Sequence, residues 1–260
     1  MSNYNWIKHY AQDRIDHIVL ARPDKRNAMN PEMVKELREA VSDSAKDPET
    51  RALLLKAEGK AFSAGADLEY IQQMQQFSYQ DNIDDSRSMM SLFQDLYYHP
   101  KLTVAQVQGP AIAGGCGLAT LADFIFSVPE AQFGYTEARI GFLPAMVMVF
   151  LIRKVGENKA RQLLLTGKLI SSEAAREMGL IYRVTDQEKI ENEVQSFIED
   201  TITRTSGDSI AYIRQMIGEV QNLRLDEALD YAAEKNAMAR NTEDCKNGIA
   251  AFLNKEPIRW

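Results

Sequence analysis

The chain has 260 residues, of which 45% are hydrophobic and 26% charged, and its formal net charge is −7. This length suits one large domain, and the composition is that of a soluble globular protein. The acidic balance argues against a nucleic-acid partner, which would need a basic face, and gives no sign of attraction to a membrane. The two cysteines, Cys116 and Cys245, lack metal-site spacing and the histidines are scattered, so no metal site is predicted. The first residues show no secretory signal, and we expect a cytoplasmic protein.

The first two thirds of the chain alternate short apolar runs with amphipathic stretches. Four runs are predicted as strands: 15–21, 51–56, 102–107 and 124–128. Helices are predicted between them, and the first has Asn30 as its N-cap and Pro31 at its first position. The polar segment 79–88 is expected to be exposed and mobile. Strands that alternate with helices predict an α/β fold with a largely parallel sheet.

The strand signal ends after residues 180–184. Beyond that point four helices are predicted: 190–204, 209–220, 225–240 and 242–253. Thr242 is the predicted N-cap of the last one. We therefore expect an α/β core over residues 1–190, followed over 191–260 by a helical region that covers an interface or packs on the core.

The first candidate site is the loop 62–67, which leaves a strand and enters a helix. Small residues at Ala64, Gly65 and Ala66 allow the backbone to approach a ligand closely, and a helix N-terminus presents free N–H groups. The alternative is an ordinary strand-to-helix turn. A serine-hydrolase elbow is disfavoured because Ala61 stands where the G-x-S-x-G motif requires glycine.

The second candidate is the glycine-rich loop 113–119, which also joins a strand to a helix. A dinucleotide fingerprint is the competing interpretation, but Gly115-x-Gly117-x-x-Thr120 lacks its third glycine. The third candidate is Glu137, a carboxyl among apolar and aromatic neighbours. Such surroundings raise a carboxyl pKa and suit an acid/base role, whereas a surface ion pair with Arg139 is the alternative.

Together these segments resemble the enoyl-CoA hydratase/isomerase family, often called the crotonase family. The motifs that carry the resemblance follow the family's order: Arg22-Pro23-x-x-x-Asn27-Ala28, Ala64-Gly65-Ala66-Asp67-Leu68, Ala113-Gly114-Gly115-Cys116, Phe133-Gly134-Tyr135-Thr136-Glu137-x-x-x-Gly141-x-x-Pro144 and Ala250-Ala251-Phe252-Leu253-Asn254-Lys255. The resemblance implies a spiral of ββα units with a helical C-terminal trimerisation region. It also implies a homotrimer or a homohexamer built from two trimers. The implied ligand is an acyl-CoA, in which coenzyme A is part of the substrate, and no separate cofactor is expected.

The family's functional residues can be carried over position by position. The N–H groups of Ala66 and Gly114 are implied to bind the thioester oxygen, and Glu137 to carry the proton. Contacts with the substrate are implied for Arg26, Ala28, Ala64, Ala66, Asp67, Leu68 and Gly114, and for Phe252 and Lys255 at the nucleotide end of a neighbouring subunit.

The chain departs from many hydratases of this family at Gly117, where a second glutamate would stand. The pattern is nearest to bacterial 3-methylglutaconyl-CoA-type hydratases, in which a small residue at this position would leave room for a branched substrate. Three hypotheses follow: a hydratase of substituted enoyl-CoAs, a double-bond isomerase that uses Glu137 alone, and a catalytically silent acyl-CoA-binding protein.

Overall fold

The computed structural model describes residues 4–260, and its centre is a six-stranded sheet with the order β1-β2-β3-β4-β6-β9. These strands are β1 (Ile7–Gln12), β2 (Ile15–Leu20), β3 (Ala52–Ala57), β4 (Leu102–Val107), β6 (Phe124–Ser127) and β9 (Arg183–Val184). β1 and β2 form an antiparallel hairpin, and the remaining pairs are parallel. A second sheet joins β5 (Ala111–Ile112), β7 (Gln132–Gly134) and β8 (Ile170–Ser171). The predicted α/β fold with a largely parallel sheet is confirmed.

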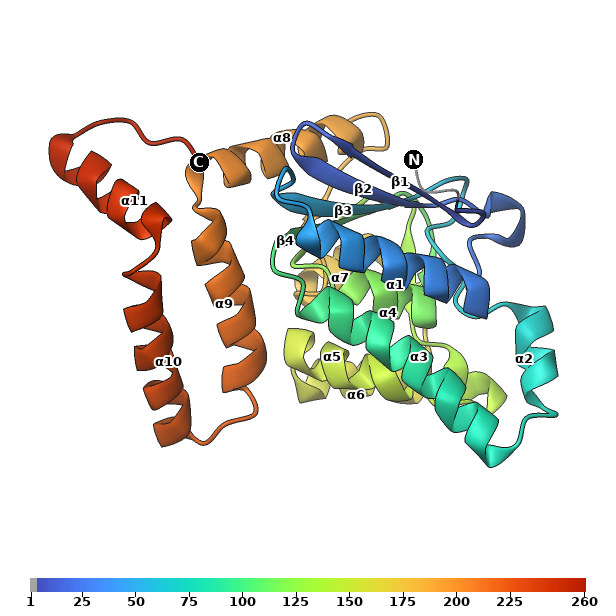
Figure 1. Ribbon diagram of the computed structural model, residues 1–260. Helices are drawn as coiled ribbons and strands as arrows, with labels where there is room; N and C mark the ends of the chain where they lie inside the picture. The colour runs from blue at the N-terminus through green and yellow to red at the C-terminus, as the bar shows by residue number, and fades with distance from the viewer. Residues whose placement is uncertain (1–3) are drawn as a thin grey trace.

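Helices lie on both sides of the main sheet (Figure 1). Those before β9 are α1 (Pro31–Lys46), α2 (Leu68–Met74), α3 (Tyr79–Tyr97), α4 (Gly114–Thr120), α5 (Ala145–Val155), α6 (Glu157–Thr166) and α7 (Ser172–Glu177). α1 and α3 run side by side below the sheet in this view. α1 packs there because Val34, Leu37 and Val41 recur every three or four positions and are buried on one face. Short 3-10 turns occupy Pro23–Lys25 and Glu137–Ile140.

Two predicted helix caps are confirmed. The Asn30 side chain accepts a hydrogen bond of 3.0 Å from the Met33 N–H at the start of α1. The Thr242 hydroxyl accepts one of 3.2 Å from the Cys245 N–H at the start of α11 (Glu243–Asn254). In both cases a side-chain oxygen binds one of the N–H groups that have no partner within the helix.

The segment 79–88 is not the wholly exposed stretch that its polarity suggested, because it forms the first half of α3. A reciprocal capping box starts the helix: the Ser78 hydroxyl accepts from the Asp81 N–H, and the Asp81 carboxylate accepts from the Ser78 N–H. One side of this half-helix is half-buried and the other exposed. The short strands β5 and β8, of two residues each, were also missed because so few residues show no alternation.

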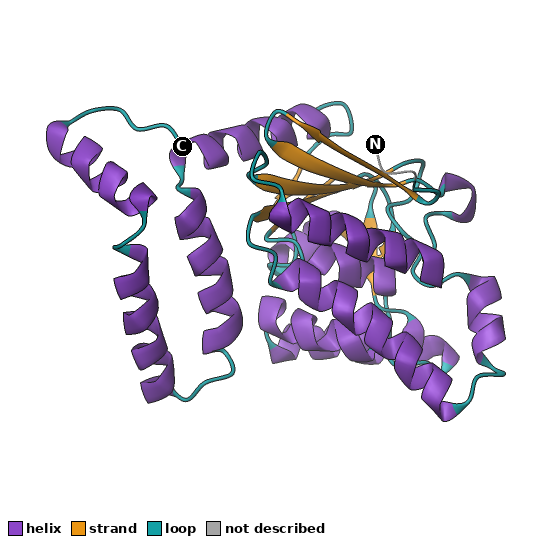
Figure 2. Ribbon diagram, in the orientation of Figure 1, coloured by secondary structure: helices purple, strands orange, loops and turns teal. Residues whose placement is uncertain are grey.

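The C-terminal helices divide into two groups. α8 (Ile190–Arg204) buries Ile190, Val194, Ile198 and Ile202 and contacts β4 and β6, so it belongs to the core layers although it follows residue 190. α9 (Gly207–Val220), α10 (Leu225–Ala239) and α11 then form an all-helical arm beside the core (Figure 2).

A buried arginine connects this arm to the core. Arg214 of α9 donates to the carbonyl of His99 at 2.6 Å and to the carbonyl of Leu96 at 3.1 Å, and it pairs with Asp123. Carbonyls at the end of α3 thereby gain a buried cationic partner. Of the helices between residues 4 and 260, none combines the length and apolar character needed to cross a bilayer.

Candidate active site

The two glycine-rich loops meet beside the second sheet. Loop 62–67 follows β3, and its backbone pairs with the second loop: the Ile112 N–H donates to the Ser63 carbonyl at 2.9 Å. Gly65 has φ +92°, and a methyl group on it would lie 2.9 Å from the Ala113 Cβ and 3.4 Å from the Gly114 nitrogen. Glycine is therefore required at position 65 both by its backbone conformation and by the close approach of the second loop.

Ala66 and Gly114 present free backbone N–H groups at this junction. Across residues 4–260, neither N–H donates a hydrogen bond to another protein group. The residue before Gly114 is held firmly, because the Ala113 N–H donates to the Gly134 carbonyl at 2.8 Å and the Ala113 carbonyl accepts from Gly117 at 3.0 Å. Ala113 has φ +53°, which is unfavourable for a residue with a Cβ and which persists only when its surroundings enforce it.

A buried ion pair supports the first loop from behind. Asp67 is 4% exposed, and its side chain accepts from the Arg22 guanidinium at 2.5 Å and from the Glu69 N–H at 2.8 Å. Burial alone would raise the pKa of Asp67, but hydrogen bonds from Arg22 and from the N–H groups of Tyr70 and Glu69 hold it below its ordinary value. The Asp67 carboxylate thus caps α2 and positions the loop, and its oxygens are turned into the protein.

Glu137 is the first residue of the 3-10 turn that follows β7. Its Oε2 atom is buried and, within the described part of the chain, has no hydrogen-bond partner. No ion pair joins it to Arg139 among residues 4–260, so the surface-pair interpretation is not supported. Burial raises the pKa of the Glu137 carboxyl above its ordinary value. A buried carboxyl oxygen without a partner is unusual and fits a group that exchanges protons with a ligand.

One cavity of about 480 Å³ joins these features. Its wall includes Ala64, Ala66, Leu68, Gly114 and Glu137. The remainder is mostly apolar: Met29, Val34, Ile71, Met74, Phe77, Met89, Phe93, Met146 and Val147. The two free N–H groups and the Glu137 carboxyl therefore line the same, mostly apolar cavity.

Other residues from the sequence prediction lie outside this wall. Arg26 is exposed beside the first loop and its carbonyl accepts from the Ala64 N–H at 3.0 Å, whereas Ala28 is 7% exposed. Phe252 and Lys255 lie at the end of α11, on the opposite side of the molecule from α2 (Figure 1). A single chain does not bring them to the cavity.

Position 117 is filled by a neighbour. A Cβ on Gly117 would lie 2.1 Å from Val147 Cγ1 and 3.3 Å from Phe93 Cζ. The expectation that Gly117 leaves room for a branched substrate is therefore wrong, because the Val147 side chain of α5 occupies that space. Val147 itself forms part of the cavity wall, so an apolar group stands where many relatives are expected to hold a second carboxylate.

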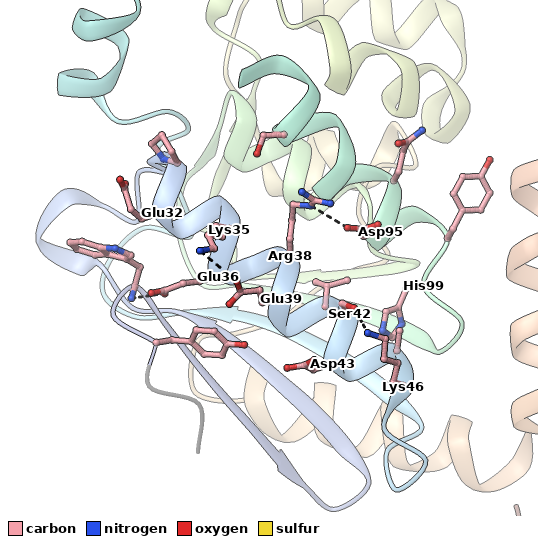
Figure 3. Close-up of a pocket in the computed structure, with 18 of the residues that line it drawn as sticks. Glu32, Lys35, Glu36, Arg38, Glu39, Ser42, Asp43, Lys46, Asp95 and His99 are labelled. Atoms are coloured by element: carbon pink, nitrogen blue, oxygen red, sulfur yellow. Dashed lines mark hydrogen bonds and ion pairs between the residues drawn. The ribbon is translucent and has the colours of Figure 1, made fainter. Parts of the chain in front are cut away.

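A larger hollow lies elsewhere on the surface. It has a volume of about 1580 Å³ and follows the outer face of α1 towards His99 (Figure 3). Its charged side chains neutralise one another, as in the pairs Arg38–Asp95 at 3.4 Å and Lys35–Glu39 at 4.0 Å. Neither glycine-rich loop reaches it, and we place the chemistry in the smaller cavity.

Comparison with known proteins agrees with this fold. The Enoyl-CoA hydratase/isomerase family profile matches residues 11–260. A Thermus thermophilus protein provisionally named an enoyl-CoA hydratase is 40% identical over 243 residues, which cover 94% of this chain and 96% of that protein. A similarly named Rhizobium meliloti protein is 31% identical over 259 residues, 99% of this chain and 98% of that one. The crystal structure of an enoyl-CoA hydratase from Shewanella pealeana matches with a TM-score of 0.93 at 27% identity, over 99% and 97% of the two chains.

The fold and the paired loops define an enzyme of the crotonase class. The chain belongs to the enoyl-CoA hydratase/isomerase family, as its own motifs and these comparisons agree. Sequence reasoning missed two contributors to the site: Val147, which fills the space at position 117, and Tyr70, which lines the same cavity from α2. Asp85 lines it from the polar segment 79–88, to whose residues the sequence assigned no role.

Proposed function

We propose that this protein is an enoyl-CoA hydratase-type lyase, which adds water across the 2,3 double bond of an enoyl-CoA. Coenzyme A belongs to the substrate, and the reaction needs no separate cofactor. The observation that carries the proposal is the unpartnered Glu137 Oε2 in one cavity with the free N–H groups of Ala66 and Gly114. The family membership and the names of the relatives support it.

The proposed mechanism uses these three groups. The thioester carbonyl oxygen accepts hydrogen bonds from Ala66 and Gly114. Ionised Glu137 takes a proton from water as the water oxygen bonds to C3, and the electron pair of the double bond moves to the thioester oxygen. The resulting enolate then takes the proton from Glu137 at C2. Each oxyanion donor typically lowers such a barrier by about 3–4 kcal/mol, and the positioned carboxyl contributes about 10²–10⁴-fold.

Double-bond isomerisation is the second candidate, and Val147 at the position of the second acid favours it. That reaction moves one proton between C2 and C4, so a single carboxyl is sufficient. A silent acyl-CoA-binding protein is the third, but a binder gains nothing from burying an unpartnered carboxyl, which costs free energy.

The test is turnover by the purified chain, followed by the ultraviolet absorbance of the conjugated enoyl thioester and by identification of the products. Hydration of crotonyl-CoA, or of 3-methylglutaconyl-CoA as the resemblance suggested, supports the lyase. Conversion of a 3-enoyl-CoA with no hydrated product supports the isomerase. Binding of coenzyme A thioesters without turnover of any substrate contradicts both. Glu137→Gln is the control, and full activity in this variant contradicts the proposed role of Glu137.

We also propose that the active form is a cytoplasmic homotrimer or homohexamer. Large apolar side chains are exposed on the helical arm: Ile213, Ile217, Leu225, Leu229, Met238, Ile249, Phe252 and Leu253. Exposed apolar side chains gathered on one part of a molecule favour an interaction site there. In such an assembly Phe252 and Lys255 reach the nucleotide end of a neighbouring chain, near Arg26 and Ala28. Light scattering after size exclusion tests the assembly, and a monomer at micromolar concentration contradicts it.

A further inference from the structure

The wall of the cavity opposite the glycine-rich loops comes from α2 and the first half of α3. The two helices are joined inside the cavity by a hydrogen bond of 2.5 Å from the Tyr70 hydroxyl to Asp85 Oδ1. Both residues line the cavity and both are half-buried. Burial and the neighbouring Asp85 carboxylate keep the pKa of Tyr70 above its ordinary value, so its hydroxyl remains a donor.

The charged side chains that line the cavity are all acidic. Its ionisable carboxyl groups are Asp81, Asp84, Asp85 and Glu137, and no lysine, arginine or histidine lines it. Asp81 is bound within the capping box, and exposed Asp84 lies 3.8 Å from Arg87. Asp85 differs from both in being half-buried, and no cation pairs with it among residues 4–260. A negative charge that is half-buried and uncompensated acts more strongly on a ligand than an exposed one, since solvent screens it less.

The rest of this wall is apolar and adaptable. Met74 of α2 and Met89 of α3 contribute flexible thioether side chains, and Phe77 packs edge-on against Tyr70 at a ring separation of 5.9 Å. Methionine side chains adjust to ligands of different shape. The acyl end of the cavity thus combines apolar surface that tolerates variation with a fixed negative charge.

We propose that the acyl cavity accepts neutral, apolar acyl chains and rejects acyl chains that end in a carboxylate, with Asp85 as the specificity-determining residue. This inference rests on the proposed function in taking acyl-CoA as the ligand. A 3-methylglutaconyl group ends in a carboxylate, so the enzyme acts poorly on it in spite of the resemblance at position 117. A terminal carboxylate also loses hydration in any apolar cavity. Variants of Asp85 are therefore needed to measure how much of the discrimination against carboxylates this residue causes.

Binding of saturated thioesters tests the inference without chemistry. Matched pairs that differ only in the terminal group are titrated by calorimetry: hexanoyl- against adipoyl-CoA, and octanoyl- against octanedioyl-CoA. In the wild type the neutral member should bind at least about ten-fold more tightly, as expected for like charges in a partly buried site. The difference should shrink at high salt.

The variants separate charge from shape. Asp85→Asn keeps an acceptor for Tyr70 and removes the charge. It should bind the dicarboxylic thioester more tightly and so reduce the affinity ratio between the neutral and dicarboxylic members by about three- to ten-fold. Tyr70→Phe removes the hydrogen bond but retains the Asp85 charge. The affinity ratio between the neutral and dicarboxylic members should therefore be at least as large as in the wild type. Asp95→Asn removes a charge from the same helix outside this cavity, where Asp95 pairs with Arg38, and should change nothing.

Equal binding of the neutral and dicarboxylic thioesters at both chain lengths overturns the inference. An affinity ratio in Asp85→Asn that equals the wild-type ratio also overturns it. Hydration or isomerisation measured in parallel keeps the two proposals apart. Turnover together with equal binding of neutral and dicarboxylic thioesters contradicts only the proposed specificity. Tighter binding of the neutral thioesters without turnover contradicts only the proposed reaction. Absence of any thioester binding contradicts both proposals.

Discussion

The two walls of the catalytic cavity are built in opposite ways. The wall of the glycine-rich loops is held by backbone pairing, the strained Ala113 and the buried Arg22–Asp67 pair, and it presents the free N–H groups of Ala66 and Gly114. The wall of α2 and α3 contains Met74 and Met89, three carboxylates and a hydrogen bond between the two helices. Atoms that bind a developing charge must be fixed in advance, whereas a surface that contacts a variable chain must adapt. The rigid wall is therefore where changes should be most costly.

The largest effect is expected for Glu137→Gln. The amide keeps the shape of the side chain but cannot take a proton from water, so kcat/KM should fall by about 10²–10⁴-fold. Steady-state kinetics on the best substrate measure the loss, and calorimetry with a saturated thioester serves as the control for binding. A variant that binds normally and retains more than a tenth of the wild-type rate contradicts the role of Glu137.

The next largest effect compares the two walls through the carboxylates at the starts of their helices, Asp67 and Asp81. Asp67→Ala leaves Arg22 buried without its partner and should lower the free energy of unfolding by about 3–5 kcal/mol. Asp81→Ala removes only an exposed capping carboxylate and should cost about 0.5–2 kcal/mol. Urea unfolding of both variants measures the difference. Equal losses would show that the rigid wall has no special dependence on its ion pair.

A smaller effect is expected at the junction of α4 and α5. The methyl group of Gly117→Ala overlaps Val147 and should destabilise the protein by about 1–3 kcal/mol. The double variant Gly117→Ala/Val147→Ala restores the space. Its loss of unfolding free energy should therefore be smaller than the sum of the losses in the two single variants. Double-mutant analysis of thermal unfolding checks this coupling. Strict additivity would mean that the two side chains do not compete for one space.

The smallest effect concerns the pH dependence of the reaction. In the proposed mechanism ionised Glu137 is the proton acceptor. Burial raises the pKa of Glu137, so the rate should rise with pH, and the acidic limb of the profile should lie above the ordinary glutamate value of about 4.3. A pH profile of kcat/KM measures this limb, which should be absent from the residual rate of Glu137→Gln. An acidic limb at or below the ordinary value would place Glu137 in a more hydrated setting than the structure shows.

Local sequence signals predicted the elements and loops better than they predicted contacts. The span of α8 and the caps Asn30 and Thr242 were foreseen because helix periodicity and capping depend on neighbouring residues. The filling of position 117 by Val147 could not be foreseen, because it depends on how closely two helices approach. For the same reason the sequence did not show that the Asp67 side chain turns inward to Arg22.

The account as a whole depends on where the thioester oxygen lies. A crystal structure with a bound, unreactive acyl-CoA tests this most directly. We predict that the thioester oxygen lies within about 2.7–3.1 Å of the nitrogens of both Ala66 and Gly114, with Glu137 Oε2 facing C2 and C3. A thioester oxygen bound by other groups, or an acyl chain that leaves Glu137 without contact, would contradict the account.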